Sequence, residues 1–202
     1  MPKSLLLAGL LLGLASCQSE RLRLSPTGVY STAASFRQQQ PSLAGSQVSR
    51  SWLRRRVFVA DPAASGSRTK VSLDTVWGYA GANGRAYRVF KRGTYQVEQP
   101  DTLTIYSQQE LKYLPNSSPG SNVLLPETNY YFSAGLAGPV QPLTKKNLRR
   151  AFANNPTFLQ LLQHLKWSQA LTASPAQPTV SRTYKIVDLY RQSLALPTAQ
   201  PC

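Results

Sequence analysis

The sequence predicts an α+β fold, in which a small antiparallel β-meander of about four to six strands precedes two to three C-terminal helices. Two observations favour it. Between residues 71 and 107, short alternating apolar segments are separated by turn signals at Asn83-Gly84, Arg92-Gly93 and Pro100-Asp101, a pattern typical of antiparallel strands. After residue 143, apolar residues instead recur every three or four positions, which is typical of amphipathic helices.

Residues 1–16 resemble a bacterial lipoprotein signal peptide. A lone Lys3 precedes an apolar run from Leu5 to Leu14, and Leu14-Ala15-Ser16-Cys17 follows the pattern at which lipoproteins are acylated and cleaved. A membrane-spanning helix needs roughly 20 apolar residues, so the run is too short for one. An ordinary secretory signal, which leaves Cys17 as a plain thiol, remains the alternative. We expect Cys17 to be lipidated, for example with palmitate, and residues 17–27 to form a tether.

The chain has two cysteines and one histidine. Lipidation of Cys17 leaves Cys202 without an intramolecular partner, whereas an unmodified Cys17 could pair with it. The spacing of these residues matches neither a zinc site nor a haem attachment motif. We therefore expect no metal and no cofactor.

The β-rich part is expected to span residues 28–135. Gly28-Val29-Tyr30 predicts an entry strand, and Thr32 is a suitable N-cap for a short helix that reaches Phe36. Residues 52–60 then predict a strand, which carries Arg54 and Arg56. A Gly/Ser-rich stretch over residues 63–70 predicts an exposed loop.

The meander itself follows this loop. Its three strands are centred on Tyr87 and Val89, on Tyr95 and Val97, and on Leu103 and Ile105. Residues 114–128 contain three prolines and a glycine, and they predict a long loop. Tyr130-Tyr131-Phe132 predicts one further strand after it.

Residues 136–202 are expected to form a helical part packed on the sheet, with a flexible tail. One helix is predicted after Thr144, a second after Asn155-Pro156, and a Pro/Ser/Thr-rich connector over residues 172–182. Ile186, Leu189 and Tyr190 predict a third helix, although residues 184–187 could instead form an edge strand.

Several motifs resemble a group of uncharacterised cell-envelope lipoproteins from the Bacteroidetes. They are Gly28-Val29-Tyr30 with Phe36, Val76-Trp77-Gly78-Tyr79, Arg85-Ala86-Tyr87-Arg88-Val89, Tyr95-Gln96-Val97 and Ile105-Tyr106-Ser107. The likeness covers roughly residues 28–107 and the helix between Leu143 and Phe152. It implies a lipid-anchored envelope protein and no known activity. Asp74-Thr75-Val76 and Asp101-Thr102-Leu103 also resemble the short O-glycosylation signal of secreted proteins in that phylum.

The formal net charge of +15, from 23 basic and 8 acidic residues, favours anionic partners. The candidate binding residues are Lys145, Lys146, Arg149 and Arg150 on a predicted helix, Arg54 and Arg56 on a predicted strand, and Trp77 with Arg85 and Arg88. Two alternatives stay open. The cations can form an ordinary solvated surface, and Trp77 can pack in the core.

No residue is predicted to be catalytic. Ser67-Arg68-Thr69-Lys70 matches the S-x-x-K motif, but it falls in a predicted loop and lacks the companion S-D-N and K-T-G motifs. His164 is predicted to be exposed. The sequence thus favours an envelope lipoprotein, on the periplasmic side of a Gram-negative outer membrane, with a non-enzymatic structural or binding role. The alternatives are a binder of an anionic lipid headgroup, lipopolysaccharide or acidic glycan, and a glycan-acting enzyme; no specific nucleic acid is expected.

Overall fold

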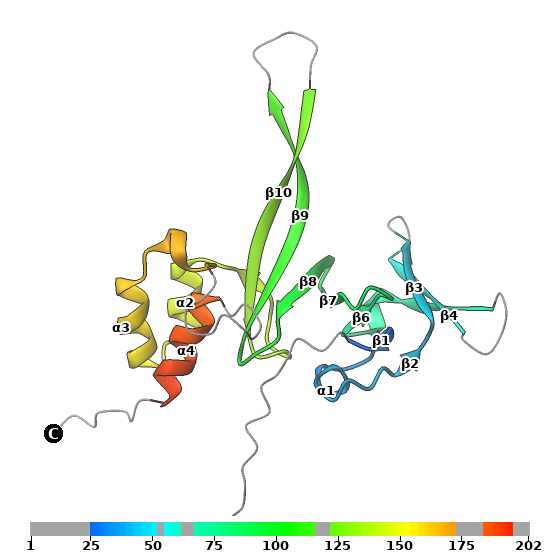
Figure 1. Ribbon diagram of the computed structural model, residues 1–202, viewed down its shortest axis with the longest axis horizontal. Coiled ribbons are helices and arrows are strands. Elements are labelled where there is room, and N and C mark those ends of the chain that lie inside the picture. Colours follow the sequence, from blue (N-terminus) through cyan, green and yellow to red (C-terminus); the bar gives the residue numbers. More distant parts are fainter. Residues whose placement is uncertain (1–24, 52–54, 62–66, 116–121, 173–183, 196–202) are drawn as a thin grey trace, which may run out of the picture.

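A computed structural model describes residues 25–51, 55–61, 67–115, 122–172 and 184–195 of the 202-residue chain (Figure 1). The predicted signal peptide, most of the predicted tether, Arg54, Cys17 and Cys202 lie outside the described residues. The described residues thus belong to the folded part that the tether would carry.

Eight strands form one antiparallel sheet in the order β11-β10-β9-β8-β7-β6-β1-β2. They are β1 (Gly28–Tyr30), β2 (Leu43–Ala44), β6 (Gly78–Ala80), β7 (Ala86–Phe90), β8 (Gly93–Gln99), β9 (Leu103–Pro115), β10 (Asn122–Ala134) and β11 (Gln141–Pro142). A second antiparallel sheet has the order β3-β4-β5, from Gln47–Ser51, Arg56–Ala60 and Arg68–Ser72. It lies at the end of the molecule opposite the C-terminal helices.

The α+β class is confirmed, but the two sheets contain more strands than the predicted four to six. Two expected loops account for much of the difference. Residues 68–70 of the predicted Gly/Ser loop belong to β5. Of the predicted loop at 114–128, residues 114–115 belong to β9 and residues 122–128 to β10. Prolines suggested a loop there, yet a strand tolerates proline where its missing N–H would face an open edge.

The helices follow the local sequence signals closely. Thr32 caps α1 (Ala33–Arg37) with a capping box, in which its hydroxyl accepts a hydrogen bond from the Ser35 N–H at 3.1 Å. Thr144 caps α2 (Lys145–Ala151), and Asn155 caps α3 (Pro156–His164). Residues from Lys185 to Ala195 form α4, so the predicted third helix is confirmed and the edge-strand alternative is wrong.

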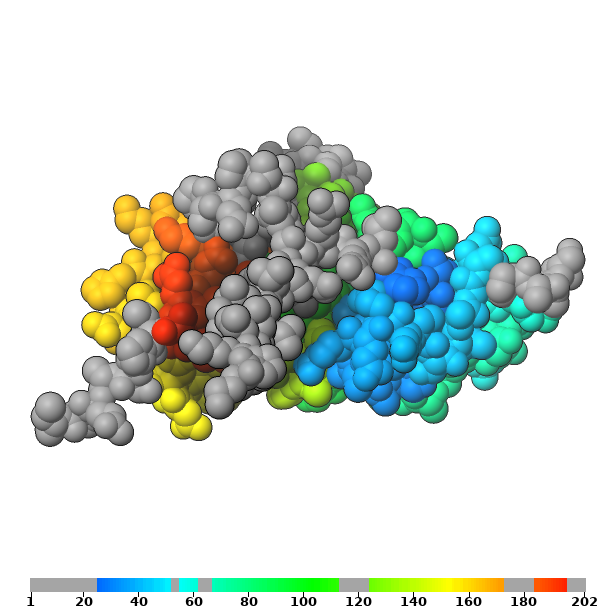
Figure 2. Space-filling model, turned by 60° about the horizontal axis from the view of Figure 1, so that its bottom comes forward, coloured from blue at the N-terminus to red at the C-terminus, as the bar shows by residue number. Residues whose placement is uncertain are grey.

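Three apolar clusters hold these elements together. Val57 and Val59 of β4 pack with Val29 and Tyr79 between the two sheets. The second cluster joins α1 to the large sheet through Tyr30, Phe36 and Trp77. The third packs β9, β10 and all three C-terminal helices around a common core: Leu103, Ile105, Phe132, Leu143, Leu148, Phe152, Phe158, Leu162, Leu165, Ala170, Ile186 and Val187. In Figure 2 the first described residues, in blue, and the C-terminal helices, in yellow to red, lie toward opposite ends of the molecule.

The β9–β10 hairpin extends well beyond this body. Its thirteen residue pairs run from Leu103↔Ala134 to Pro115↔Asn122, but β8 accompanies β9 only as far as Ser107 and β11 ends beside Tyr131. Residues 108–115 and 122–129 therefore form a two-stranded ribbon, here named the arm, which projects from the sheet (Figure 1). Leu111, Leu124 and Leu125 on it are 67%, 44% and 47% exposed.

The buried base of β9 and its arm should respond differently to the same substitution. Leu103 is fully buried, whereas Leu111, on the same face of the same strand, is exposed. We expect Leu103→Ala to lower the free energy of unfolding by about 2–5 kcal/mol, and Leu111→Ala to change it by no more than about 0.5 kcal/mol. Urea denaturation followed by circular dichroism measures both values, and equal losses would contradict the division between body and arm.

Candidate functional site

Trp77 is part of the core. Its side chain is 7% exposed, its ring stacks on Phe36 with centroids 4.5 Å apart, and its Nε1 donates a hydrogen bond to the Leu136 carbonyl oxygen at 2.9 Å. Its ring faces are therefore covered by protein rather than open to a sugar or a base. This arrangement corresponds to the packing alternative that the sequence left open.

Arg88 is buried beside Trp77 and is not a surface anion site. Its guanidinium lies 4.9 Å from the Trp77 ring centroid and donates to the same Leu136 carbonyl oxygen. Burial lowers the pKa of Arg88, because desolvation disfavours the charged form. Within the described residues its Nε has no hydrogen-bond partner. Arg85, by contrast, is exposed.

The two predicted basic groups lie far apart. On α2, Lys146, Arg149 and Arg150 are exposed, and Lys145 is half-buried. Arg150 also donates to the Gln141 side-chain oxygen at 3.2 Å. Arg56 is half-buried on β4, at the opposite end of the molecule, and Arg54 lies outside the described residues. The structure thus does not combine α2 and β4 into one binding surface.

The other chemical motifs occupy ordinary structural positions. Arg68, Thr69 and Lys70 lie on β5, so Lys70 is not one helical turn from Ser67, as the S-x-x-K chemistry requires. His164 is exposed, as predicted. Thr75 and Thr102, the possible glycosylation positions, are both exposed. Within the described ranges there is no group of three potential metal ligands, and no helix long and apolar enough to cross a membrane.

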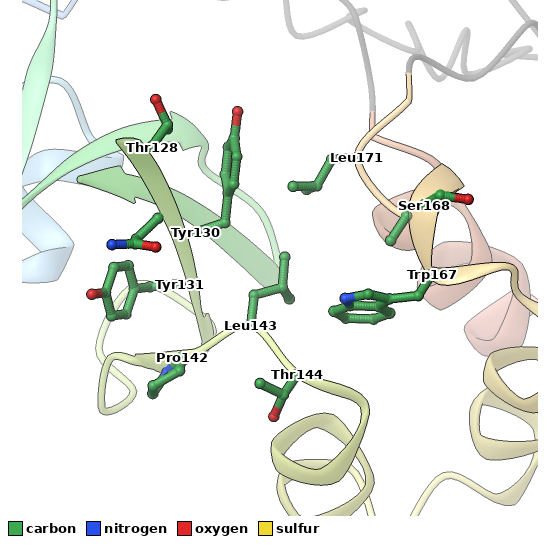
Figure 3. A pocket seen from close by; sticks show the side chains of 11 residues that line it. Thr128, Tyr130, Tyr131, Pro142, Leu143, Thr144, Trp167, Ser168 and Leu171 are labelled. Atoms are coloured by element: carbon green, nitrogen blue, oxygen red, sulfur yellow. The ribbon is translucent and has the colours of Figure 1, made fainter. Parts of the chain in front are cut away.

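A pocket of about 350 Å³ opens beside β10, within the size range of ligand sites. Its walls come from three segments: Thr128 to Tyr131 of β10, the end of β11 from Pro142 to Thr144, and the 3₁₀ turn η2 (Trp167–Gln169) with the two residues after it. Figure 3 shows the side chains of Leu143 and Trp167 pointing toward each other, with Tyr130 and Leu171 above them. Trp167 is 40% exposed.

The wall that carries Trp167 is held in place by α4. The Ile186 N–H donates to the Ala170 carbonyl oxygen at 3.1 Å, and the Lys185 Nζ donates to the Gln169 side-chain oxygen at 3.2 Å. Ala170 is itself almost completely buried. The exposed indole of Trp167 therefore extends from a fixed turn.

The opposite wall is an edge of β10, which pairs among the described residues only with β11 and Leu143. The Leu143 N–H donates to the Tyr130 carbonyl oxygen at 3.0 Å, so the backbone of Tyr130 faces away from β9. Because backbone direction alternates along a strand, Thr128 and Pro126 also direct their backbones to this side. The chain leaves the edge at Thr144, which begins the cap of α2. The pocket thus occupies the place where β11 would continue along β10.

The helical side of the pocket is positively charged. On the strand side, Glu127 precedes Thr128 and pairs with Lys112, and Glu110 accepts a hydrogen bond from Asn129 at 3.1 Å. Residues 136–172 and 184–195 contain one acidic side chain, Asp188, against seven basic ones: Lys145, Lys146, Arg149, Arg150, Lys166, Lys185 and Arg191. The Asp188 carboxylate lies 3.9 Å from the Arg191 guanidinium, which also forms an ion pair with the Asp101 carboxylate. Burial, together with Glu110, raises the pKa of Tyr131 on the pocket wall. The helical side of the pocket therefore favours a ligand with negative charge.

Sequence reasoning missed this pocket because its walls come from three separate segments. The pairing of β11 with β10 and the docking of η2 on α4 bring them together, and neither has a local sequence signal. Comparison of the chain with protein-family models, with curated proteins and with solved structures finds no match.

Proposed function

We propose that this protein is a lipid-anchored component of the cell envelope with a non-enzymatic binding role, and that the pocket beside β10 is its binding site. One observation carries the binding role: an exposed tryptophan on the basic helical side of a ligand-sized pocket faces a strand edge with which no described residue pairs beyond Leu143. The Leu14-Ala15-Ser16-Cys17 pattern supports the anchor. We place the protein on the periplasmic side of a Gram-negative outer membrane.

The tether fits this arrangement. Residues 17–27 would precede the first strand, and an extended chain spans at most about 3.6 Å per residue, or on the order of 35–40 Å for this segment. Acyl chains on Cys17 would supply the membrane affinity without a spanning helix. The folded part could then reach partners several nanometres from the membrane surface.

The anchor is tested by replacing each cysteine separately. We expect Cys17→Ser to abolish labelling by a palmitate analogue and to move the protein from the detergent phase to the aqueous phase in Triton X-114 partition, because acyl chains supply the membrane affinity. Cys202→Ser is the matched control and should leave both properties unchanged. Aqueous partition of the wild-type protein, with an intact-mass value for an unmodified thiol, would refute the anchor.

The binding site is tested by photo-crosslinking in the native host. A benzoyl-phenylalanine at position 167 should give discrete crosslinked species, because Trp167 faces the pocket. The same group at position 194 is the control, since Leu194 is 57% exposed on α4 but does not line the pocket. Identical crosslinking patterns at both positions, or none at position 167, would contradict a binding role for this pocket.

A second candidate function is binding of an anionic lipid headgroup, lipopolysaccharide or acidic glycan by α2. Lys146, Arg149 and Arg150 are exposed there. Cations in the first turn of a helix oppose its dipole, so Lys145 and Lys146 do not serve helix stability. An anionic surface would give these side chains a favourable contact.

This second function predicts a salt-sensitive interaction. Combined Lys146→Ala and Arg149→Ala should weaken binding of the soluble folded part to vesicles containing 30% phosphatidylglycerol by roughly thirtyfold, because each basic residue contributes about 1 kcal/mol near an anionic surface. Combined Arg68→Ala and Lys70→Ala removes the same charge from β5 and should have a smaller effect. Co-sedimentation at two ionic strengths measures both, and equal losses would show that net charge alone governs binding.

A further inference from the structure

The most specific feature of the pocket is the strand edge along one wall, with which no described residue pairs beyond Leu143. β11 pairs with β10 through two residues, Gln141 and Pro142, and the last contact is the hydrogen bond from the Leu143 N–H to Tyr130. Thr128 comes next with its backbone facing outward, and the pocket lies directly beside it. An extended chain placed here would continue the line of β11.

Pro126 limits how far such pairing can extend. It lies two residues before Thr128 with the same outward direction, and it has no N–H to donate. Proline at this position therefore costs no hydrogen bond between β9 and β10. It does mean that the outward edge of β10 has no backbone N–H donor at residue 126. The edge that remains is short and lies opposite Trp167 and Leu171, so the site fits a short extended segment rather than a second sheet.

The side walls specify an apolar residue in that segment. Side chains directly opposite each other on paired strands share a sheet face, so the residue paired with Thr128 would extend on the face of Thr128 and Tyr130. Leu143, Trp167 and Leu171 border the pocket on that side. The next residues along the segment would alternate to the face of Asn129 and Tyr131.

The basic residues beside the pocket favour acidic residues in the rest of the bound segment. The net charge of the chain argues against a second copy as the ligand. On the helical side of the pocket, Lys145 and Lys166 adjoin the pocket-lining residues Thr144 and Trp167, and Lys185 is bonded to the same turn. The acids Glu110 and Glu127 lie on the face of Asn129 instead, and Glu127 pairs with Lys112. Acidic residues of the segment would therefore share the face of its apolar residue. The chain itself carries +15 and has no run of acids, because its eight are dispersed: Glu20, Asp61, Asp74, Glu98, Asp101, Glu110, Glu127 and Asp188. A second copy would be repelled, whereas an acidic segment would be attracted.

We propose that the pocket binds a short, extended, acidic segment of a partner protein, which adds to β10 as a strand in line with β11 and inserts an apolar side chain between Tyr130 and Trp167. This inference rests on the proposed function and names the ligand class of the same pocket. Backbone hydrogen bonds to Thr128 supply the pairing, as in other cases of strand addition to an open sheet edge.

The test removes one backbone donor. Thr128→Pro deletes the outward N–H that the segment needs, while Pro126 shows that the arm accepts proline at a position of this kind. Gln109→Pro is the matched control, because Gln109 pairs directly with Thr128 and faces the other edge, beyond the last β8 pair at Ser107. Far-UV circular dichroism and thermal unfolding verify that both variants are folded.

The probe is a peptide selected from a random phage-displayed library on the wild-type folded part, then synthesised with a fluorescein label. We expect acidic sequences with a central apolar residue. Measured by fluorescence anisotropy, they should bind Thr128→Pro at least about tenfold more weakly and Gln109→Pro within about twofold of wild type. Methylation of alternate backbone nitrogens in the peptide should cause a loss similar to that of Thr128→Pro.

Three results would overturn the inference. A library that yields no acidic peptides would refute the ligand class, and equal binding by wild type and Thr128→Pro would refute strand addition. Binding of anionic vesicles or single-stranded DNA in competition with the peptide, undiminished by Thr128→Pro, would identify a ligand without a strand backbone. Crosslinking at position 167 but not at position 194, combined with any of these results, would leave the proposed binding role intact.

Discussion

The pairing of β9 with β10 is the constraint on which the rest of the structure depends. Thirteen residue pairs join the two strands, and the elements on either side are attached to their lower half. The C-terminal helices pack on Leu103, Ile105 and Phe132, while β8 connects β9 to the N-terminal strands. The site depends on the same ladder, since its register decides which backbone groups of β10 face the pocket.

Local hydrogen bonding explains which elements were predictable from the sequence. Thr32, Thr144 and Asn155 each cap a helix because a side-chain oxygen meets a nearby backbone N–H, a contact that needs no tertiary structure. Pro115 and Pro126 had the opposite effect, because they suggested a loop where two long strands are present. Whether proline breaks a strand depends on what lies beside it, and the sequence does not contain that information.

The two described tryptophans show why the site was harder to predict than the fold. Trp77 follows a short 3₁₀ turn and is covered by Phe36 and Leu136. Trp167 begins another such turn and is partly exposed. Nothing in their immediate neighbours distinguishes them, because the covering residues lie tens of positions away in the chain. Exposure, and with it the capacity to bind, is here a property of tertiary packing.

The edge of β10, which no described residue covers beyond Leu143, raises the question of what keeps two copies of the protein from pairing through it. Free edges favour pairing between copies, and proteins protect them with charge, proline and short length. Here Pro126 removes one outward donor, and every copy carries the same charge of +15, so two edges repel each other before they can pair. Acidic chains escape that repulsion. The features that oppose self-association therefore favour the ligand class inferred for the pocket.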